Sequence, residues 1–384
     1  MNGFDVCVLG RGAVGQALAL SLGRLGLSVA LVAPARPDTG PGAADVRTYA
    51  LGASSIALLD QLKVWDAVRA ARPSAATRVL DMQVRGDGAG AGALNFSAWQ
   101  QGVGELAWIV DAAVLERELA NALRFAPHVQ LLDAAVEAPL TAICEGKDGA
   151  TRAALGIETE RFDYGQTAVA ARLGSERPHQ GIARQWFGAP DVLALLPFDL
   201  ADGPGYGLVW SLPDERARTL LAVEPAAFEA ALAEATQGAA GPLRLQGERA
   251  AWPLRVASAR RWHGRWPGRA DAAWVLLGDA AHVVHPLAGQ GLNLGLADVR
   301  TLAEVLAERQ RGAAWRPLSD ERLLARYARR RIAPTWAMTR LTDGLQKLFA
   351  EPAPLLRQAR NRGLSVVESL PPLKRWLAAR ALAD

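Results

Sequence analysis

The segment FDVCVLGRGAVGQALALSLGRLGLSVALVAP, residues 4–34, decides the fold. The apolar run 4–9 is typical of a buried parallel strand, and the leucine spacing of 16–26 predicts a helix. A second apolar run at 28–34 predicts another strand. The chain is therefore expected to begin with a strand–helix–strand unit, which places it in the α/β class with a Rossmann-like first domain.

The turn GRGAVG between the first strand and the helix has the spacing of a dinucleotide-binding loop. Its first glycine allows a sharp turn, its second lets backbone amides approach a pyrophosphate, and its third lets the helix pack closely on the strand. The start of the helix adds free N–H donors and a positive dipole end. A tight structural turn without a ligand is the alternative reading. The cofactor contacts expected here are Gly10, Gly12, Ala13, Val14 and Gly15.

One part of this fingerprint is absent. The acidic residue that normally follows the second strand, near the adenosine ribose, should lie at about Ala33. Asp38 or Asp45 are candidates to replace it, or the ribose is held without a carboxylate. We expect this departure to weaken the affinity for the cofactor.

The composition is that of a folded globular protein. Of 384 residues, 50% are hydrophobic and 21% are charged, and the length favours two interleaved domains. The net charge of +4 comes without a basic run interleaved with aromatic residues, which argues against nucleic-acid binding. Cys7 and Cys144 have no metal-site spacing and indicate a reducing compartment. No signal peptide or membrane-spanning run is evident, so we expect a cytoplasmic protein.

A second motif, WVLLGDAAHVVHPLAGQGLNLGLAD, occupies residues 274–298. An apolar strand is expected to end at Gly278, which places the Asp279 carboxylate where α/β sheets contact ligands and where it can accept hydrogen bonds from ribityl hydroxyls. The loop PLAGQG then opens a helix from about Leu292, whose start can stabilise negative charge on a flat ring. The ring-facing residues are expected to be Pro286, Ala288, Gly289, Gln290 and Gly291, with further cofactor contacts from Gly278, Asp279, Leu292 and Asn293.

This motif resembles the second FAD signature of the class A flavoprotein monooxygenases, in the branch of the ubiquinone-biosynthesis hydroxylases. The matching positions are His285, Pro286, Ala288 to Gly291, Asn293, Gly295 and Asp298. Segments 45–66, 163–171, 176–187, 193–198 and 327–349 resemble that branch in the same order. The resemblance assigns Arg47 as a contact on the flavin or substrate side.

The resemblance implies a p-hydroxybenzoate hydroxylase-like fold. An FAD-binding domain is expected from residues 1–80, 100–160 and 270–340, an antiparallel-sheet substrate domain from 81–99 and 161–269, and a helical C-terminus from 341–384. The residue pattern itself predicts a hairpin or an excursion at 85–95. It also predicts strands at 167–172, 193–198, 206–212 and 219–223, and helices at 54–70, 112–124 and 226–236.

The family usually carries an Asp-Gly motif at the end of a strand that lines the FAD pyrophosphate. Its nearest match is CEGKDGATR, in which Asp148 and Gly149 supply these two residues. Whether they form a working motif, with Asp148 as a cofactor contact, or a loop that has the same letters stays open at this point.

The activity implied by the resemblance is hydroxylation of an aromatic ring, with a polyprenylated phenol of ubiquinone biosynthesis as substrate. FAD carries the chemistry through a flavin C4a-hydroperoxide, with O2 and either NADPH or NADH as co-substrates, so no catalytic side chain is expected. One alternative is an FAD-dependent reductase or oxidase of another lipid-like substrate. Another is a flavoprotein kept as a structural partner in a biosynthetic assembly.

Three further features of the sequence could have a function or a purely structural role. His282 and His285 have the spacing of a metal pair but no third ligand, so no metal is expected. His179 is either a substrate contact or a surface residue at a strand end. The basic segment 370–384 is either an ordinary last helix or an amphipathic contact, peripheral to the inner membrane or to a ubiquinone-biosynthesis assembly.

Overall fold

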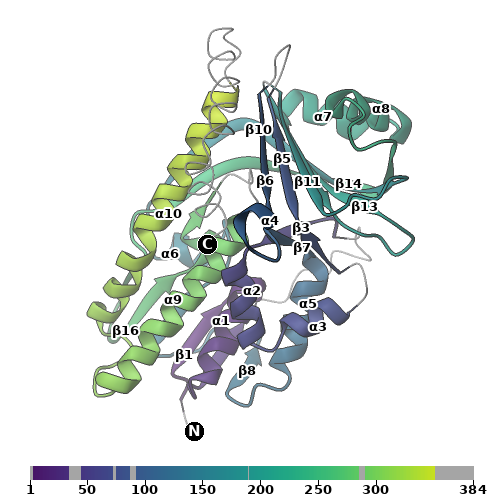
Figure 1. The fold of residues 1–384 in the computed structure, drawn as a ribbon. Helices are drawn as coiled ribbons and strands as arrows, with labels where there is room; N and C mark the ends of the chain where they lie inside the picture. The colour runs from purple at the N-terminus through teal and green to yellow at the C-terminus, as the bar shows by residue number, and fades with distance from the viewer. Residues whose placement is uncertain are drawn as a thin grey trace.

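The computed structural model describes residues 3–33, 45–71, 75–86, 92–188, 190–284 and 290–350. Its strands form three sheets, of six, eight and three strands. The six-stranded sheet and its helices form one half of the molecule, and the eight-stranded sheet forms most of the other half (Figure 1). The predicted α/β class is confirmed.

The six-stranded sheet is a parallel sheet with one antiparallel edge strand. Three of its central strands are buried along their whole length, which explains their continuous apolar sequences. In spatial order the strands are β15 (His263–Trp266), β16 (Arg269–Leu276), β9 (Leu140–Ile143), β1 (Val6–Leu9), β2 (Val29–Val32) and β8 (Val129–Leu132).

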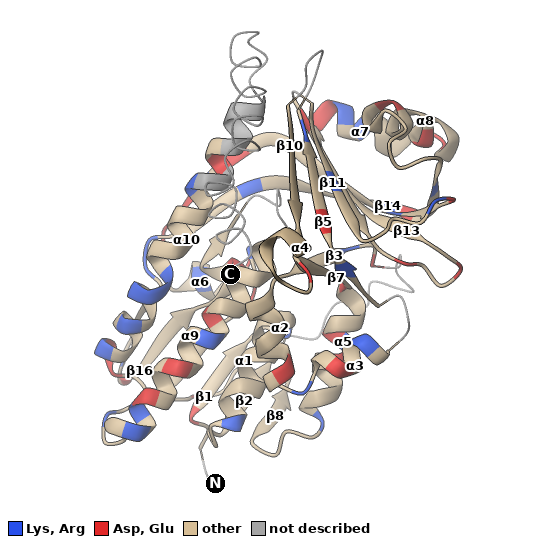
Figure 2. Ribbon diagram, in the orientation of Figure 1, with Lys and Arg blue, Asp and Glu red and all other residues tan. Residues whose placement is uncertain are grey.

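The predicted strand–helix–strand unit is confirmed as β1, α1 (Ala13–Arg24) and β2. Helix α1 packs between α5 (Ala112–Leu123) and α9 (Gln290–Gly312), and α9 in turn packs against α10 (Glu321–Ala350). Basic side chains follow α10 along the outside of the molecule (Figure 2). Glu308 of α9 pairs with two of them, Arg326 and Arg330, at 3.0 Å each.

The three-stranded sheet lies between the two larger ones and joins them. It consists of β3 (Thr48–Leu51), β7 (Ala107–Asp111) and β4 (Ala76–Val79), with β7 in the middle. The single helix predicted over 54–70 is wrong, since the structure has α2 (Ala53–Gln61) and α3 (Trp65–Ala70). Lys63 adopts a φ of 61° and breaks the helix, which lets Trp65 pack edge-on against Trp108 at 5.2 Å.

The eight-stranded sheet is antiparallel except for one parallel pair, β5 with β11. The predicted hairpin is confirmed as β5 with β6, and three of the four predicted strands are confirmed as β10, β12 and β13. In spatial order the strands are β17 (His282–Val283), β14 (Leu243–Ala259), β10 (Thr159–Ser175), β13 (Gly205–Pro213), β12 (Asp191–Pro197), β11 (Ile182–Gly188), β5 (Asp81–Arg85) and β6 (Ala93–Ser97).

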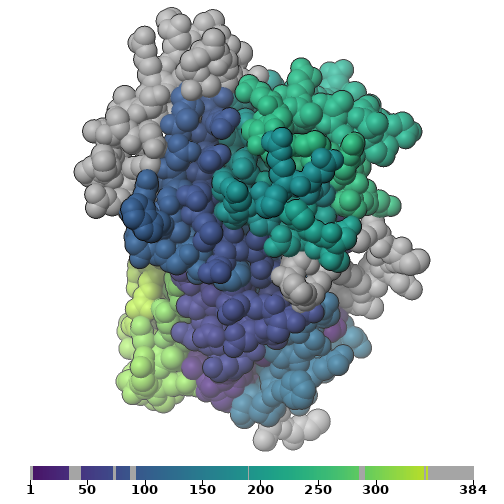
Figure 3. Space-filling view, turned by 45° about the vertical axis from the view of Figure 1, so that its right-hand side comes forward, coloured from purple at the N-terminus to yellow at the C-terminus, as the bar shows by residue number. Residues whose placement is uncertain are grey.

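The strand predicted at 219–223 is wrong, because most of this segment is the end of helix α7 (Asp214–Ala222). Asp214 and Glu215 occupy the first turn, where negative charge favours a helix, and Ala217 and Leu220 are its buried positions, three residues apart. Helix α7 and helix α8 (Pro225–Thr236) cover one face of the eight-stranded sheet, at the top of Figures 1 and 3. The other face of the eight-stranded sheet faces the rest of the molecule.

Three short elements complete the described structure. They are α4 (Ala98–Gln101), α6 (Ala150–Ala154) and the 3-10 turn η1 (Gly278–Ala280). Within the described ranges, no helix has both the length and the apolar composition that crossing a lipid bilayer requires. The division into domains that the resemblance implies stays a prediction.

Candidate active site

A cavity of about 1060 Å³ lies between the six-stranded and the eight-stranded sheets. Its polar end is formed by the glycine turn after β1, the residues that follow β9 and β16, and the start of α9. Its other end is formed by the inner face of the eight-stranded sheet. One continuous space therefore joins the carboxyl ends of parallel strands, where α/β sheets bind ligands, to an apolar sheet face.

The three glycines of the turn occupy different environments. A Cβ on Gly10 would lie 2.3 Å from the Cys144 carbonyl oxygen, and one on Gly15 would lie 1.9 Å from the Gly10 carbonyl oxygen. A Cβ on Gly12 would have no atom within 4 Å. Gly10, Gly12, Ala13 and Val14 line the cavity, whereas Gly15 lies beneath the turn. Packing thus requires the first and third glycines, while the second faces open space.

Helix N-termini converge on the polar end of the cavity. Gly12 precedes α1 and Gly52 precedes α2, neither with a side-chain cap, and α9 begins at Gln290. All three residues line the cavity. The first backbone N–H groups of a helix have no partner within it, and its dipole is positive at this end. This part of the cavity therefore suits the negatively charged groups of a ligand.

Asn293 joins the start of α9 to the start of α2. Its Oδ1 accepts hydrogen bonds from the Gly52 N–H at 3.1 Å and the Ser55 hydroxyl at 2.7 Å. Its Nδ2 donates to the Ala50 carbonyl at 2.8 Å. The described part of the predicted flavin loop lines the cavity, namely Gln290, Gly291, Leu292 and Asn293. Asn293 thus holds two of the converging helices in a fixed relation.

Asp279 follows β16 and lines the cavity, as its place at a strand end predicts. Its side chain is open to the cavity but surrounded by protein atoms, and this desolvation raises the pKa of its carboxyl group. Gly278 does not line the cavity. It turns the chain with a φ of 59°, and a Cβ there would come within 3.2 Å of the Val14 side chain.

A fully buried ionic cluster supports this turn from below. Asp298 of α9 accepts a hydrogen bond from the Gly278 N–H at 2.9 Å, and its carboxylate lies 2.7 Å from His282 Nε2 and 2.6 Å from Arg331 Nε. Burial alone would raise the pKa of Asp298, but His282 and Arg331 hold it below its ordinary value. His282 also stacks on Trp262, with ring centroids 5.1 Å apart. The cluster fixes the backbone that carries Asp279.

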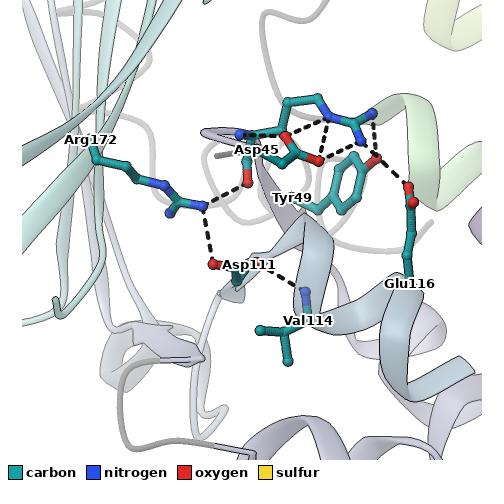
Figure 4. Close-up of polar contacts among 7 residues, drawn as sticks. Asp45, Tyr49, Asp111, Val114, Glu116 and Arg172 are labelled. Atoms are coloured by element: carbon teal, nitrogen blue, oxygen red, sulfur yellow. Dashed lines mark hydrogen bonds and ion pairs between the residues drawn. The ribbon is translucent and has the colours of Figure 1, made fainter. Parts of the chain in front are cut away.

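Arg47 lies on the cavity wall within a second polar network (Figure 4). Its guanidinium pairs with Asp45 at 2.6 Å and lies 3.5 Å from Glu116 and 3.3 Å from the Tyr49 hydroxyl. Burial raises the pKa of Tyr49 to about 12. From the eight-stranded sheet, Arg172 donates to the Arg47 carbonyl at 2.8 Å. The network connects both halves of the molecule at the cavity.

The residues after β9 line two separate cavities. Glu145 and Gly146 line the large cavity, whereas Asp148 and Gly149 line a separate one of about 340 Å³. Strand β9 ends at Ile143, so Glu145 occupies the position at the strand end that Asp148 was expected to hold. Its carboxylate accepts hydrogen bonds from the Thr151 N–H at 3.0 Å and hydroxyl at 2.9 Å. Asp148 lies away from the large cavity because four residues, 144–147, separate it from the end of the strand.

Arg152 connects this loop to the Asp279 turn. It donates to the Ala280 carbonyl at 2.8 Å and also to the Lys147 carbonyl. Burial lowers the pKa of Arg152. The two strand ends that face the middle of the cavity are therefore held together by one buried arginine.

The ends of β2 and β8 form another part of the wall. Ala33 lies there, at the position that the sequence identifies as missing its acid. Asp133, one strand away, lines the same cavity. Asp45 is paired with Arg47, and Asp38 lies outside the described residues.

The eight-stranded sheet lines its side of the cavity mainly with apolar side chains, several of them small. Alanines from neighbouring strands leave room, and larger side chains surround them, while Arg184 and Gln185 are the polar members from β11. Arg184 donates to the Tyr206 hydroxyl at 2.8 Å. The apolar side chains include Met82, Phe96, Ala168, Ala170, Ala183, Ala194, Leu196, Leu208, Val209, Trp252 and Leu254.

Several other predicted residues lie away from this site or outside the description. His179 lies 2.8 Å from Asp199 and does not line the cavity, and His282 belongs to the Asp298 cluster. Outside the described residues lie Pro286, Ala288, Gly289, His285 and the segment 351–384. The part of the chain that the structure describes contains no group of three or more His, Cys, Asp or Glu side chains placed to hold a metal ion.

Sequence reasoning missed Asp133, Glu145, Gly146, Tyr49 and Glu116 on the cavity wall. Three of them carry a signal in the sequence, because Asp133 directly follows β8 and Glu145–Gly146 come within three residues of the end of β9. Reading each short apolar run of 128–145 as a parallel strand would have placed them at the ligand edge of the sheet.

Comparison with known proteins agrees with this geometry. A family model described as FAD binding domain matches residues 109–342. Ubiquinone hydroxylase UbiL of Rhodospirillum rubrum is 30% identical over 400 residues, which cover 98% of this chain and 89% of that protein. The 3-demethoxyubiquinol 3-hydroxylase of Escherichia coli is 31% identical, with 98% of each chain covered.

Solved structures of lower identity share the fold. The p-nitrophenol 4-monooxygenase PnpA from Pseudomonas putida superposes with a TM-score of 0.73 at 18% identity, covering 99% of this chain and 98% of that one. PqsL of Pseudomonas aeruginosa gives a TM-score of 0.71 at 23% identity, with 94% and 99% covered. The family model and the relatives aligned over nearly the whole chain lead to one conclusion: this chain belongs to the class A FAD-dependent monooxygenases, in the branch of the ubiquinone-biosynthesis hydroxylases.

Proposed function

We propose that this enzyme hydroxylates the aromatic ring of a prenylated phenol in ubiquinone biosynthesis, using FAD, O2 and NADPH or NADH. The observation that carries the proposal is the single cavity of about 1060 Å³, which is polar where parallel strands end and apolar along the eight-stranded sheet. The polar end suits a ligand that contains a charged nucleotide, and the apolar end suits a second, lipid-like ligand.

The residues of the polar end fit FAD. Because a Cβ on Gly12 would meet no protein atom, the space above the glycine turn is available to a pyrophosphate. Arg11 brings positive charge to the same wall, and the Asp279 carboxylate can accept hydrogen bonds from ribityl hydroxyls. We assign Glu145–Gly146, rather than Asp148–Gly149, to the position of the Asp-Gly motif, since only the former pair lines the cavity.

Bound FAD, once reduced by NAD(P)H, supplies the activation of O2 and the transfer of one oxygen atom to the ring. The chain supplies the surroundings. The N-terminus of α9 lies at the cavity wall, where its backbone donors and positive dipole end would stabilise negative charge on a bound flavin ring. Asn293 holds the start of α9 against the start of α2, and the Asp298 cluster holds the turn that carries Asp279. These segments therefore need little reorganisation during the reaction.

The apolar end fits the substrate. The alanines of β10, β11 and β12 leave space for an isoprenoid chain, and the large apolar side chains around them exclude water from the ring. Arg184 offers a cation on the same wall, where it can orient the phenol oxygen and stabilise negative charge that develops on it. Because such a substrate resides in lipid, the proposal includes a peripheral contact with the inner membrane or with a biosynthetic assembly.

The test is NAD(P)H oxidation by the FAD-loaded protein, measured together with the hydroxylated product. A prenylated phenol should stimulate NAD(P)H oxidation and yield a product with one more hydroxyl group, whereas a benzoate should do neither. The matched control is Gly12→Val, which removes the space for the pyrophosphate and should abolish both signals. If the prenylated phenol leaves NAD(P)H oxidation unchanged, or is reduced instead of hydroxylated, the proposed substrate or reaction is wrong.

A further inference from the structure

The end of β2 lacks the acidic side chain that Rossmann-like sites use to hold a ribose. Strand β2 ends at Val32, and Ala33 follows it on the cavity wall with no polar side chain. An alanine there leaves the hydroxyls of a bound adenosine ribose without an acceptor from this strand.

The neighbouring strand supplies a carboxylate at the same level. Strands β2 and β8 run parallel with Val32 opposite Leu132, so Ala33 and Asp133 are the next residues of the two strands. The Ala33 N–H donates to the Leu132 carbonyl at 3.4 Å, which keeps the two ends side by side. Neighbouring strands lie about 4.8 Å apart. A side chain from Asp133 therefore starts one strand spacing from the position that the missing acid would occupy.

Asp133 is free to bind a ligand. Its side chain is exposed and lines the cavity together with Gly10 and Gly12 of the glycine turn. Among the described residues, no hydrogen-bond donor or cation contacts its carboxylate. Two other carboxylates of the cavity region are engaged, since Asp45 is paired with Arg47 and Glu145 accepts two hydrogen bonds from Thr151.

We propose that Asp133, one strand away from the usual position, accepts hydrogen bonds from the 2′- and 3′-hydroxyls of the adenosine ribose of FAD. A carboxylate has two oxygens and a ribose offers two adjacent hydroxyl donors, so a paired contact satisfies both groups. The inference rests on the proposed function only for the identity of the cofactor. It moves the ribose contact from β2 to β8 within the same sheet edge.

The test measures the dissociation constant of FAD with flavin-free protein, by fluorescence titration. Asp133→Ala should weaken FAD binding by about 10- to 100-fold, the range for loss of a charge-assisted contact. FMN contains no adenosine, so its affinity should be equal in the two proteins, and this also shows that the variant is folded. Glu137→Gln, an exposed residue of the same segment that does not line the cavity, is the matched control and should leave both affinities unchanged.

A second variant returns the acid to its usual strand. In the Asp133→Ala background, Ala33→Glu should restore much of the lost FAD affinity, because both positions border the same part of the cavity. If Asp133→Ala binds FAD as tightly as the unchanged protein does, the inference is overturned while the assignment of FAD stands. If the unchanged protein binds no FAD at all, the proposed function fails together with it.

Discussion

Two glycines of this site, Gly12 and Gly15, lack a side chain for different physical reasons. Gly15 is a glycine because any Cβ would collide with the Gly10 carbonyl, and this requirement exists in the protein without a ligand. Gly12 has ordinary backbone geometry, with a φ of −71°, and open space around it. Its lack of a side chain has a physical reason only when a ligand fills that space. The two glycines can be separated by experiment.

Gly12→Ala is expected to leave the free energy of unfolding of the flavin-free protein nearly unchanged and to weaken FAD binding by at least about tenfold, since the methyl group would occupy the open space proposed for the phosphates. Gly15→Ala is expected to destabilise the flavin-free protein by about 1–3 kcal/mol or more, because its Cβ would lie 1.9 Å from a carbonyl oxygen. Denaturant unfolding and flavin titration measure the two effects. Equal stability losses in both variants would contradict this distinction.

Removing the Asp279 carboxylate is expected to have opposite effects on the stability of the protein and on FAD binding. Its pKa is raised in the folded protein, so the unfolded chain ionises first as the pH rises. Ionisation of Asp279 therefore costs stability above the ordinary carboxyl pKa, and this loss persists at neutral pH. Asp279→Asn should stabilise the flavin-free protein at pH 7 but not at pH 3, and should weaken FAD binding by about 10- to 100-fold.

The measurement for Asp279 is thermal unfolding at the two pH values, followed by FAD titration at pH 7. Glu137→Gln serves as the control, because that carboxylate is exposed at the surface. If flavin-free Asp279→Asn is less stable than the unchanged protein at pH 7, the carboxylate stabilises the fold, and the proposed role in ligand binding does not explain it.

At the scale of elements, strand ends and helix starts meet along one edge of the six-stranded sheet. The segments after β1, β2, β8, β9 and β16 all line the cavity, and α1, α2 and α9 begin there. What keeps this edge in place is largely buried polar bonding. Asp298 joins the turn after β16 to α9 and, through Arg331, to α10, while Asn293 joins α9 to α2.

Asp298→Asn should reduce the free energy of unfolding by about 3–5 kcal/mol, because it leaves Arg331 buried without its counter-charge. Since the pKa of Asp298 is lowered in the folded protein, its contribution is present above the ordinary carboxyl pKa and is lost as the pH falls through its folded value. The difference between the two proteins should thus shrink in acid. Denaturant unfolding at neutral and acidic pH measures it.

Glu308→Gln is the matched control for Asp298→Asn. Glu308 also pairs with arginines between α9 and α10, but at the surface, so its loss should cost less than about 1 kcal/mol. A similar small cost for Asp298→Asn would mean that the buried cluster does not hold the Asp279 turn.

At the scale of the whole molecule, two sheets of different kind share one cavity, and each contributes a different chemical surface. The polar edge belongs to the parallel sheet and the apolar wall to the antiparallel one. In the space-filling view, the residues of the eight-stranded sheet and its helices sit above those of the N-terminal segments (Figure 3). Cofactor and substrate binding should therefore be separable by mutation.

Ala194→Phe is expected to lower kcat/KM for a prenylated phenol by about tenfold or more, because the ring fills space on the apolar wall. The affinity for FAD should stay unchanged, since the proposed FAD contacts lie at the polar end of the cavity. Ala226→Phe, on the exposed surface of α8, is the control for adding a phenylalanine. Loss of FAD binding in Ala194→Phe would contradict the division of the cavity.

The parts of the molecule that the sequence could predict are those with a local cause. The glycine turn, the Asp279 strand end and the start of α9 each depend on a short run of residues, and the described parts of all three line the cavity. The strand predicted at 219–223 is wrong because a run of five residues, four of them apolar, does not distinguish a strand from the end of a helix. The sequence places Asp133 and Glu145 only at the ends of short apolar strands, because whether those ends share one cavity depends on which strands are neighbours, and pairing is a property of the folded sheet.

The most direct test of the central claim is incorporation of oxygen-18 from labelled O2. The FAD-loaded protein is given a prenylated phenol and NAD(P)H under labelled O2, and the product is analysed by mass spectrometry. The account predicts a hydroxylated phenol that carries one labelled oxygen atom, formed in step with NAD(P)H consumption. An unlabelled product, or NAD(P)H consumption that yields only hydrogen peroxide and unchanged phenol, would contradict it.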